Sequence, residues 1–127
     1  MTSKILTKVE WQLMQVLWRL EKAFIKEILF ELPEPKPAYN SVSTIIRILE
    51  KKGAIGYEPH GNTHQYYPLI DKSDYLKFAT EDFLLNHFSN SMSKMFKFYL
   101  TKNILDSNDV YNLQTILSNN IKMTNSI

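Results

Sequence analysis

The stretch AYNSVSTIIRILEKKGAIGYEPHGNTHQYYPL, residues 38–69, decides the fold of this chain. Its first half mixes aliphatic and polar residues with a helical period, and it ends at Gly53, a residue type that commonly closes helices. We predict a helix over residues 40–52, with Asn40 or Ser41 as its N-cap, because short polar side chains accept hydrogen bonds from the first amides of a helix.

The second half of the stretch predicts a β-hairpin. Residues 54–58 and 63–67 are rich in residue types that favour strands, and residues 60–62, His-Gly-Asn, are typical of a turn. We therefore expect two short antiparallel strands directly after the helix.

Two further helices are predicted upstream. Thr7 and Glu10 form the T-x-x-E pattern of a capping box, which predicts a helix over residues 8–20. Apolar residues at helical spacing predict a second helix over residues 24–32, which must end at residues 33–37, where three of the five residues are proline. That segment could be a proline-rich ligand, but we interpret it as a stiff connection between two helices.

The predicted order is helix, helix, helix and hairpin, so the fold class is mainly α with a small β-hairpin. Trp11 and Trp18 lie on the apolar side of the first helix, and we expect both to be core residues. The order is that of a winged helix-turn-helix, in which the third helix reads the major groove of DNA and the hairpin is the wing.

The helix over residues 40–52 has two different faces when its residues are placed at 100° intervals. Its apolar face consists of Val42, Ile45, Ile46 and Leu49. The opposite face carries short polar side chains, which can approach a base-pair edge closely, and an arginine, which can make a bidentate contact to guanine. The candidate DNA-binding residues of this helix are Asn40, Ser41, Ser43, Thr44, Arg47 and Lys51.

The tip of the predicted hairpin is polar and carries no carboxylate. A wing at this place would contact phosphates, which position a protein on DNA without reading its sequence. Lys51 and Lys52, at the end of the preceding helix, add positive charge that we expect to face the DNA backbone. The candidate wing residues are His60, Asn62, Thr63 and His64.

Residues 71–127 read as helices with large apolar stripes. We predict helix over residues 71–102, interrupted at residues 89–91, and a last helix over residues 107–121. These stripes have more apolar surface than the helices can cover alone, which indicates a partner, most simply a second copy of the chain. Packing of the tail against the first domain is the alternative. The candidate dimerisation residues are Phe83, Leu84, Phe88, Met92, Met95, Phe96, Tyr99, Val110, Leu113, Leu117 and Ile121.

We therefore divide the chain into a winged-helix DNA-binding domain, residues 1–70, and a helical dimerisation region, residues 71–127. A length of 127 residues and a hydrophobic content of 44% suit one small domain with an appended region. The net charge of +2 is small for a DNA-binding protein, but a dimer that grips DNA twice needs less charge per subunit. Cysteine is absent, which excludes disulfides and thiolate metal sites. No segment resembles a signal peptide or membrane span, so we expect a cytoplasmic protein.

Other functions fit the residues less well. The histidines lack the H-E-x-x-H spacing, a metal pair of His60 and His64 would lie on a hairpin tip, and no G-x-S-x-G turn occurs. We expect neither an enzyme nor a metal or other cofactor. A winged helix can also be a protein-protein interaction module without direct DNA binding. Such a module would expose apolar or aromatic anchors on the helix over residues 40–52, where this chain has polar residues.

Three segments carry a more specific signal. They are Glu10-Trp11 with Met14 and Leu17-Trp18, the run from Asn40 to the Leu-Glu-Lys-Lys-Gly motif at Gly53, and Gln65-Tyr66-Tyr67-Pro68-Leu69. Over nearly the whole chain, the sequence resembles the penicillinase and methicillin-resistance repressors, the BlaI/MecI-type family. The resemblance implies a homodimeric winged-helix repressor that binds a palindromic operator in double-stranded DNA, with the C-terminal helices forming the dimer. It places the groove-reading residues at Asn40, Ser41, Ser43, Thr44 and Arg47, and the wing contacts at residues 60–64.

The resemblance also implies a further partner, a membrane sensor-protease system that leads to cleavage of the repressor at an Asn-Phe bond in the C-terminal helices. This chain departs from the family there. The corresponding pair is Phe98-Tyr99, and the sequence contains no Asn-Phe dipeptide. Copper-sensing relatives carry a C-terminal cysteine cluster, which is also absent. Neither induction route is therefore carried over to this chain.

Overall fold

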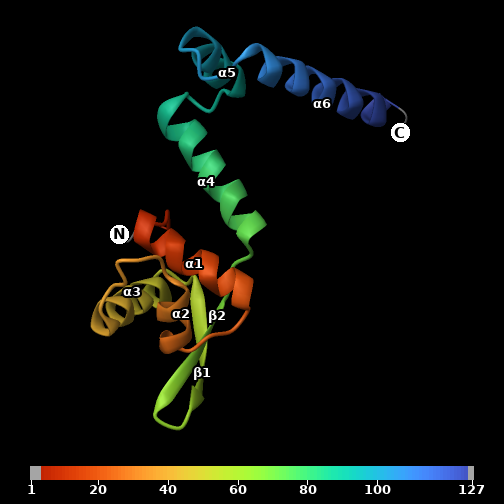
Figure 1. The fold of residues 1–127 in the computed structure, drawn as a ribbon. Helices are drawn as coiled ribbons and strands as arrows, with labels where there is room; N and C mark the ends of the chain where they lie inside the picture. Colours follow the sequence, from red (N-terminus) through yellow and green to blue (C-terminus); the bar gives the residue numbers. More distant parts are fainter. Residues whose placement is uncertain (1–3, 126–127) are drawn as a thin grey trace. The chain divides into compact units, whose positions relative to one another are not determined.

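The computed structural model describes residues 4–125, with side chains as far as residue 121. The chain divides into two compact units, residues 1–79 and 80–127, with the boundary inside the fourth helix. Figure 1 shows the elements, which are α1 (Lys8–Leu20), α2 (Ile25–Glu31), α3 (Tyr39–Lys51), β1 (Ile55–His60), β2 (Thr63–Pro68), α4 (Lys72–His87), α5 (Met92–Thr101) and α6 (Ser107–Asn125).

Helix α1 begins and ends where the sequence predicts. The Thr7 hydroxyl accepts a hydrogen bond from the backbone N–H of Glu10 at 3.3 Å, and the Glu10 carboxylate accepts one from the backbone N–H of Thr7 at 2.8 Å. This capping box satisfies two amides that have no partner within the helix, so it fixes the start of α1.

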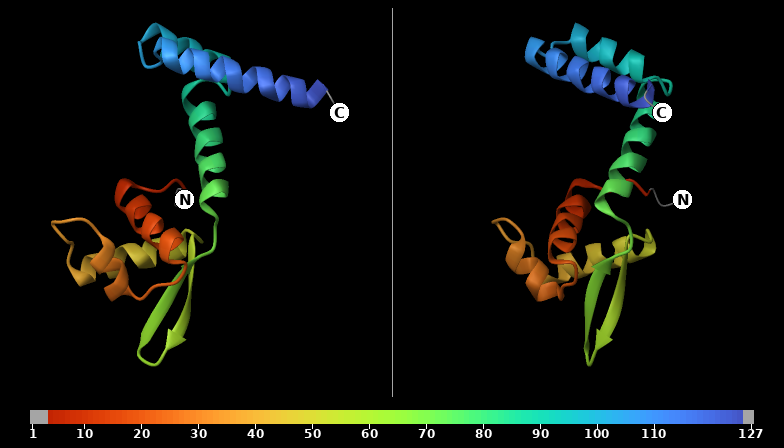
Figure 2. Two further views of the ribbon diagram at one scale, coloured as in Figure 1. Left: turned by 45° about the vertical axis from the view of Figure 1, so that its right-hand side comes forward. Right: turned by 90° about the vertical axis from the view of Figure 1, so that its right-hand side faces the viewer.

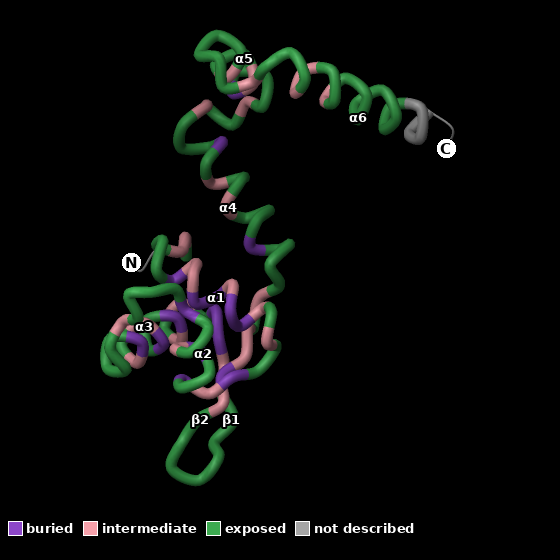
Figure 3. Tube along the Cα trace, viewed as in Figure 1, coloured by how far each residue is buried: buried purple, intermediate pink, exposed green. Residues whose placement is uncertain are grey.

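The core of the first unit lies where the three helices meet the base of the hairpin. Leu13 of α1, Ile28 of α2 and Ile46 of α3 are fully buried. Each such side chain stabilises the fold by about 1.5–3 kcal/mol relative to exposure. Figure 3 shows the buried residues of this unit concentrated along the inner sides of these helices. The other buried members are Met14, Val16, Leu17, Ala23, Ile25, Leu32, Val42, Leu49, Ala54, Ile55 and Tyr66.

The proline-rich connection after α2 is held in place by Lys36. Its Nζ donates to the carbonyl oxygens of Leu29, Phe30 and Leu32, at 3.1, 2.7 and 2.7 Å. The last carbonyls of a helix lack partners within the helix, so this ammonium caps the C-terminus of α2. The segment serves as a fixed connection between α2 and α3.

Helix α3 starts at Tyr39, one residue earlier than predicted, and its N-cap is Ala38. The prediction of Asn40 or Ser41 as the N-cap is wrong. The helix starts on backbone hydrogen bonds alone, because the Ala38 carbonyl accepts from the amides of Ser41 and Val42 at 3.0 and 3.1 Å. The side chains of Asn40 and Ser41 are therefore not used as caps and stand exposed on the first turn.

The two strands form an antiparallel hairpin in which Ile55 pairs with Pro68 and His60 with Thr63. Each strand has six residues, one more than predicted. Strand β1 continues through Pro59 to His60. In a two-stranded sheet both strands are edges, where proline can lack its N–H without breaking an interior ladder. The predicted hairpin itself is confirmed.

A β-bridge outside the two strands joins the hairpin to the loop between α1 and α2. Ala23, in the loop after α1, exchanges backbone hydrogen bonds of 2.9 and 2.8 Å with Tyr66 of β2. The views in Figures 1 and 2 show the rest of the hairpin extending away from α1, α2 and α3. Three helices followed by this hairpin form a winged helix, as the sequence predicts.

Trp11 and Trp18 are half-buried, so the expectation that both are core residues is only partly right. Trp18 packs against the core, and its Nε1 donates to the Ile70 carbonyl at 2.9 Å. Trp11 lies further out, with its ring centroid 5.4 Å from that of Trp18 and 5.7 Å from that of Tyr75. Large amphipathic rings of this kind often pack at the edge of a small core, where the indole N–H can find a partner.

The second unit contains the predicted break in the helix. Ser89 and Asn90 have positive φ values of 52° and 59°, which end α4, and the predicted interruption is confirmed. Ser91 then caps α5, because its hydroxyl accepts from the backbone N–H of Lys94 at 3.2 Å. Helix α6 begins at Ser107, as predicted, and continues four residues beyond the predicted end.

Candidate nucleic-acid interface

Helix α3 has one side locked in the core and one side open to solvent. Val42, Ile46 and Leu49 are fully buried, which holds the helix in a fixed rotation. Of the six candidate DNA-binding residues, Ser43 is half-buried and the others are exposed. The term outer face of α3 is used below for its exposed residues after Tyr39, which are Asn40, Ser41, Thr44, Arg47, Ile48 and Lys51.

The polar groups of the outer face differ in what they can still bind. Thr44 donates its hydroxyl proton to the Asn40 carbonyl at 3.0 Å, so it can offer only an acceptor and a methyl group outward. The ion pairs among the described residues do not include Arg47 or Lys51. Both cations are therefore available to an external anion or hydrogen-bond acceptor.

The four candidate wing residues are all exposed. Gly61 lies between them with a φ of 60°, a left-handed conformation that glycine adopts without strain. The Thr63 hydroxyl donates to the His60 carbonyl at 3.0 Å and closes the tip. The His64 ring stacks on Tyr57 with centroids 4.2 Å apart and planes 11° apart, which fixes the side of the hairpin on which this imidazole lies.

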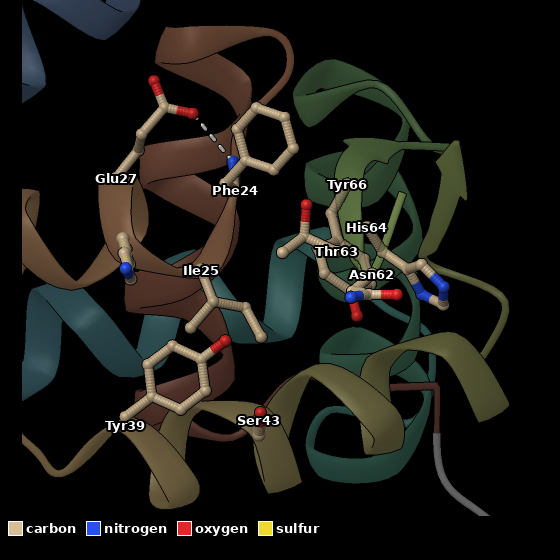
Figure 4. Close-up of a pocket in the computed structure, with 10 residues that line it drawn as sticks. Phe24, Ile25, Glu27, Tyr39, Ser43, Asn62, Thr63, His64 and Tyr66 are labelled. Atoms are coloured by element: carbon tan, nitrogen blue, oxygen red, sulfur yellow. Dashed lines mark hydrogen bonds between the residues drawn. The ribbon is translucent and has the colours of Figure 1, made fainter. Parts of the chain in front are cut away.

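A concave pocket of about 530 Å³ lies between α2, α3 and the hairpin. Figure 4 shows Tyr39 and Ser43 of α3 on one side of it and Asn62, Thr63 and His64 of the hairpin on another. The structure thus brings four of the ten predicted DNA-binding residues, Ser43, Asn62, Thr63 and His64, together around one pocket. The remaining lining residues are Phe24, Ile25, Lys26, Glu27 and Tyr66.

Six predicted site residues do not line this pocket, and they are Asn40, Ser41, Thr44, Arg47, Lys51 and His60. Lys51 lies at the end of α3. The His60 ring lies edge-on to the ring of Phe24, with centroids 5.5 Å apart. Its Nε2 lies 3.7 Å from a carboxylate oxygen of Glu58. Glu58 also pairs with Lys22 at 3.2 Å. The tip itself has no carboxylate, but the strand leading to it places one beside His60.

Lys52 does not face outward, so the expectation that it adds charge toward a DNA backbone is wrong. Its side chain is only 7% exposed, and its Nζ lies 2.6 Å from Oε1 of Glu10 and 3.2 Å from the carbonyl oxygen of Ile5. The sequence gives Lys51 and Lys52 the same chemistry. The fold separates them, because adjacent residues of a helix lie about 100° apart around its axis.

Tyr66 of β2 is one of the buried core residues of the first unit. Tyr66 is buried against α3, and this burial, followed by the nearby charge of Glu50, raises the pKa of its phenol above the ordinary value. The phenol stays protonated at neutral pH, so this side of the pocket gains no negative charge from Tyr66.

Several residues of this surface were not predicted from the sequence. Tyr39 is 45% exposed at the start of α3, and Ile48 is 38% exposed on its outer face. Lys26 reaches the pocket from α2, and Tyr57 supports the wing through His64. The placement of residues at 100° intervals could have identified Ile48, because it lies outside the apolar face of Val42, Ile45, Ile46 and Leu49. Nothing in the local sequence connects Lys26 or Tyr57 to α3, because that proximity arises from the tertiary fold.

The candidate dimerisation residues of the second unit differ in exposure. Leu84 and Met95 are buried within the unit itself. Exposed members are Phe83, Met92, Leu117 and Ile121, and half-buried members are Phe88, Phe96, Tyr99, Val110 and Leu113. Large exposed apolar residues of this unit that were not predicted are Leu85, Phe98, Leu100, Ile104, Tyr111 and Ile116.

Among the described residues, no group of three or more His, Cys, Asp or Glu side chains is arranged to hold a metal ion. A helix with the length and apolar character needed to cross a membrane is likewise not found in that part of the chain.

Comparison with known proteins identifies relatives along most of the chain. The penicillinase repressor of Bacillus licheniformis is 26% identical over 113 residues, which are 88% of each chain. The methicillin resistance regulatory protein MecI of Staphylococcus aureus is 24% identical over 114 residues, which are 89% of this chain and 93% of that protein. The solution structure of the DNA binding domain of the repressor BlaI is similar with a TM-score of 0.51 and 28% identity, covering 59% of this chain and 94% of that domain.

A family model described as penicillinase repressor matches residues 6–119. This range contains α3, the hairpin, and all of α4 and α5. The chain belongs to the penicillinase repressor family.

Proposed function

We propose that this protein is a transcriptional repressor that binds double-stranded DNA as a homodimer, at a palindromic operator. The outer face of α3 is the observation that carries the proposal. One side of this helix is fixed by three fully buried residues, and the other presents short polar side chains and an arginine that makes no ion pair among the described residues. A rigid helix with such a face fits the major groove.

In the major groove, Arg47 has the most specific role. Its guanidinium can donate two parallel hydrogen bonds to O6 and N7 of a guanine. Asn40 and Ser41 can hydrogen-bond other base edges or phosphates, since neither side chain is used as a helix cap. Thr44 can act only as an acceptor or through its methyl group, because its proton is bound to the Asn40 carbonyl.

The wing and Lys51 would bind the backbone beside the groove. The pocket between α3 and the hairpin places Ser43 opposite Asn62 and Thr63, and the side chains of Ser43 and Asn62 can donate to phosphate oxygens. Lys51 supplies a cation at the end of α3, and binding through it releases counterions from DNA. Lys52 has no part in this contact, because it is buried against Glu10.

The second unit supports the homodimer. Its described residues include ten large exposed apolar side chains, among them Leu117 and Ile121 of α6. Exposed apolar surface of this kind is costly in water, and a second copy of the chain would cover it symmetrically. A two-fold dimer would bind two half-sites about one helical turn apart, or a multiple of it.

We place the protein in the cytoplasm, with DNA accessible to it. Release from DNA by a sensor-protease system at an Asn-Phe bond does not suit this chain, since the pair is absent from its sequence.

Selection of bound duplexes from a random DNA pool by the full chain tests this proposal. The expected result is enrichment of one palindromic sequence with two equal half-sites. Enrichment of a single, asymmetric site would contradict the homodimer, and no enrichment at any salt concentration would contradict sequence-specific DNA binding. In the second case the same surface would have to serve as a protein-protein interaction module.

A further inference from the structure

Ile48 is the one large aliphatic residue on the outer face of α3 within the described chain. It is 38% exposed, whereas Val42, Ile46 and Leu49 of the same helix are fully buried. Thr44 lies one turn before it and Lys51 three residues after it. Ile48 therefore adds an apolar side chain to a surface that is otherwise polar or cationic.

Thr44 enlarges this apolar spot. Its hydroxyl is turned back to the Asn40 carbonyl at 3.0 Å, so the methyl group is the part of the side chain that is not engaged within the helix. Residues four apart on a helix are surface neighbours, which sets the Thr44 methyl beside Ile48. The pair is called the Thr44–Ile48 apolar patch below.

The patch is too small to anchor a protein partner. Interaction surfaces for proteins are contiguous apolar areas of several hundred Å², usually with aromatic anchors at their centre. Two aliphatic groups with Arg47 and Lys51 nearby fit a small apolar group on a negatively charged molecule such as DNA. In the major groove that group is the C5-methyl of thymine, which thymine alone among the four bases carries there.

We propose that the Thr44–Ile48 apolar patch contacts thymine C5-methyl groups in each operator half-site, and that Ile48 is a specificity-determining residue. This inference rests on the proposed function, because it assumes that α3 enters the major groove. It adds a requirement that the polar residues do not impose. Arg47 selects guanine through hydrogen bonds, whereas Ile48 selects thymine over cytosine and over the methyl-free base uracil through burial of a methyl group.

The size of the effect follows from the size of the group. Burial of one methyl or methylene group corresponds to about a three- to fivefold change in affinity. Replacing a contacted thymine by deoxyuridine removes that methyl group and leaves every hydrogen-bonding position of the base pair unchanged. The wild-type protein should lose about three- to fivefold in affinity at each contacted position.

The experiment uses the full chain and the operator obtained by selection, with deoxyuridine replacing each thymine in turn. Fluorescence anisotropy titrations compare the wild type with Ile48→Ala and with Val9→Ala, a matched aliphatic change at a 45% exposed position of α1. Ile48→Ala should discriminate less than the wild type between the thymine and deoxyuridine operators, because only the Thr44 methyl of the patch remains. Val9→Ala should discriminate as the wild type does. Far-ultraviolet circular dichroism checks that both variants are folded.

Two results would overturn the inference while leaving the proposed function intact. The wild type could bind the operator specifically with no loss at any deoxyuridine position, or Ile48→Ala could retain the full discrimination of the wild type. A complete lack of specific binding to any duplex would overturn the proposed function itself, and this inference with it. Ile48→Val provides a further check, because the shorter side chain should retain part of the discrimination.

Discussion

The Nζ atom of Lys52, at the end of α3, lies 2.6 Å from Oε1 of Glu10 on the first turn of α1. Both side chains are less than a tenth exposed. Glu10 belongs to the capping box that starts α1, and Lys52 directly precedes the glycine that leads into the hairpin. One ion pair therefore joins the start of the first helix to the turn between α3 and the wing.

Removal of either partner should destabilise the fold strongly. Lys52→Met leaves the Glu10 carboxylate buried without its cation, which typically costs about 3–5 kcal/mol. The matched change at the neighbouring exposed lysine, Lys51→Met, should alter the free energy of unfolding by less than about 0.5 kcal/mol. Urea titrations of both variants measure the difference. Equal effects would show that Lys52 is not buried in solution, and the double variant Glu10→Gln with Lys52→Met should recover much of the loss.

Stability should fall in acid because of the same pair. Burial alone would raise the pKa of the Glu10 carboxyl, but the hydrogen bonds from Lys52 and from the Thr7 amide, with the charge of Lys52, lower it below the ordinary value of 4.5. A lowered pKa means that the folded state binds this proton less readily than the unfolded state does. The contribution is therefore complete above pH 4.5 and is lost as the pH falls through the lower, folded-state pKa.

Urea midpoints measured between pH 7 and pH 3 check this dependence. Glu10→Gln should be less stable at pH 7 and should show a smaller decrease below pH 4.5 than the wild type. A change at the exposed Glu21, to Gln, should leave the shape of the curve as it is. If the wild type and Glu10→Gln lose stability in parallel, the pair does not contribute to acid unfolding.

The two adjacent lysines also show what the sequence could not reveal. The capping box of Thr7 and Glu10 predicts the first residue of α1 correctly, because its two partners are close together in the sequence. The burial of Lys52 depends on Glu10, 42 positions away, so no local pattern distinguishes it from Lys51. Local signals also missed Ala38 as the N-cap of α3, because backbone hydrogen bonds replace the side-chain cap that the sequence predicts.

Part of the candidate site was predictable from the sequence, namely the outer face of α3, and the pocket that it shares with the hairpin was not. The helical period separates Val42, Ile46 and Leu49 from the outer face, and the structure shows the same division. The pocket that Ser43 shares with Thr63 depends on how the hairpin packs on the helices, through the bridge of Ala23 to Tyr66. Such long-range pairing leaves no periodic signal in the chain.

Lys51 should contribute to DNA affinity through charge alone. Lys51→Ala should weaken binding to specific and nonspecific duplexes to a similar extent, and should reduce the slope of log affinity against log salt by about 1 per subunit. Anisotropy titrations at several salt concentrations give this slope. An unchanged slope would remove Lys51 from the phosphate contacts.

The apolar stripe of α6 should hold the dimer together. Leu117→Glu places a charge on an exposed apolar position of this stripe and should shift the protein toward monomers. Asn119→Glu, an exposed position about 200° around the helix, introduces the same charge as a control and should leave the dimer intact. Sedimentation velocity at micromolar concentration measures both. A wild-type monomer under these conditions, or equal effects of the two variants, would contradict dimerisation through this stripe.

The central claim is that the outer face of α3 reads DNA sequence, and Arg47→Ala tests it most directly. Affinities of the wild type and this variant are measured on the selected operator and on a scrambled duplex, with Arg19→Ala as a control, since Arg19 is already paired with Glu31 at 2.9 Å. The account predicts that Arg47→Ala loses about 1–3 kcal/mol of binding free energy on the operator, loses much less on the scrambled duplex, and remains folded and dimeric. An operator affinity equal to that of the wild type would contradict it.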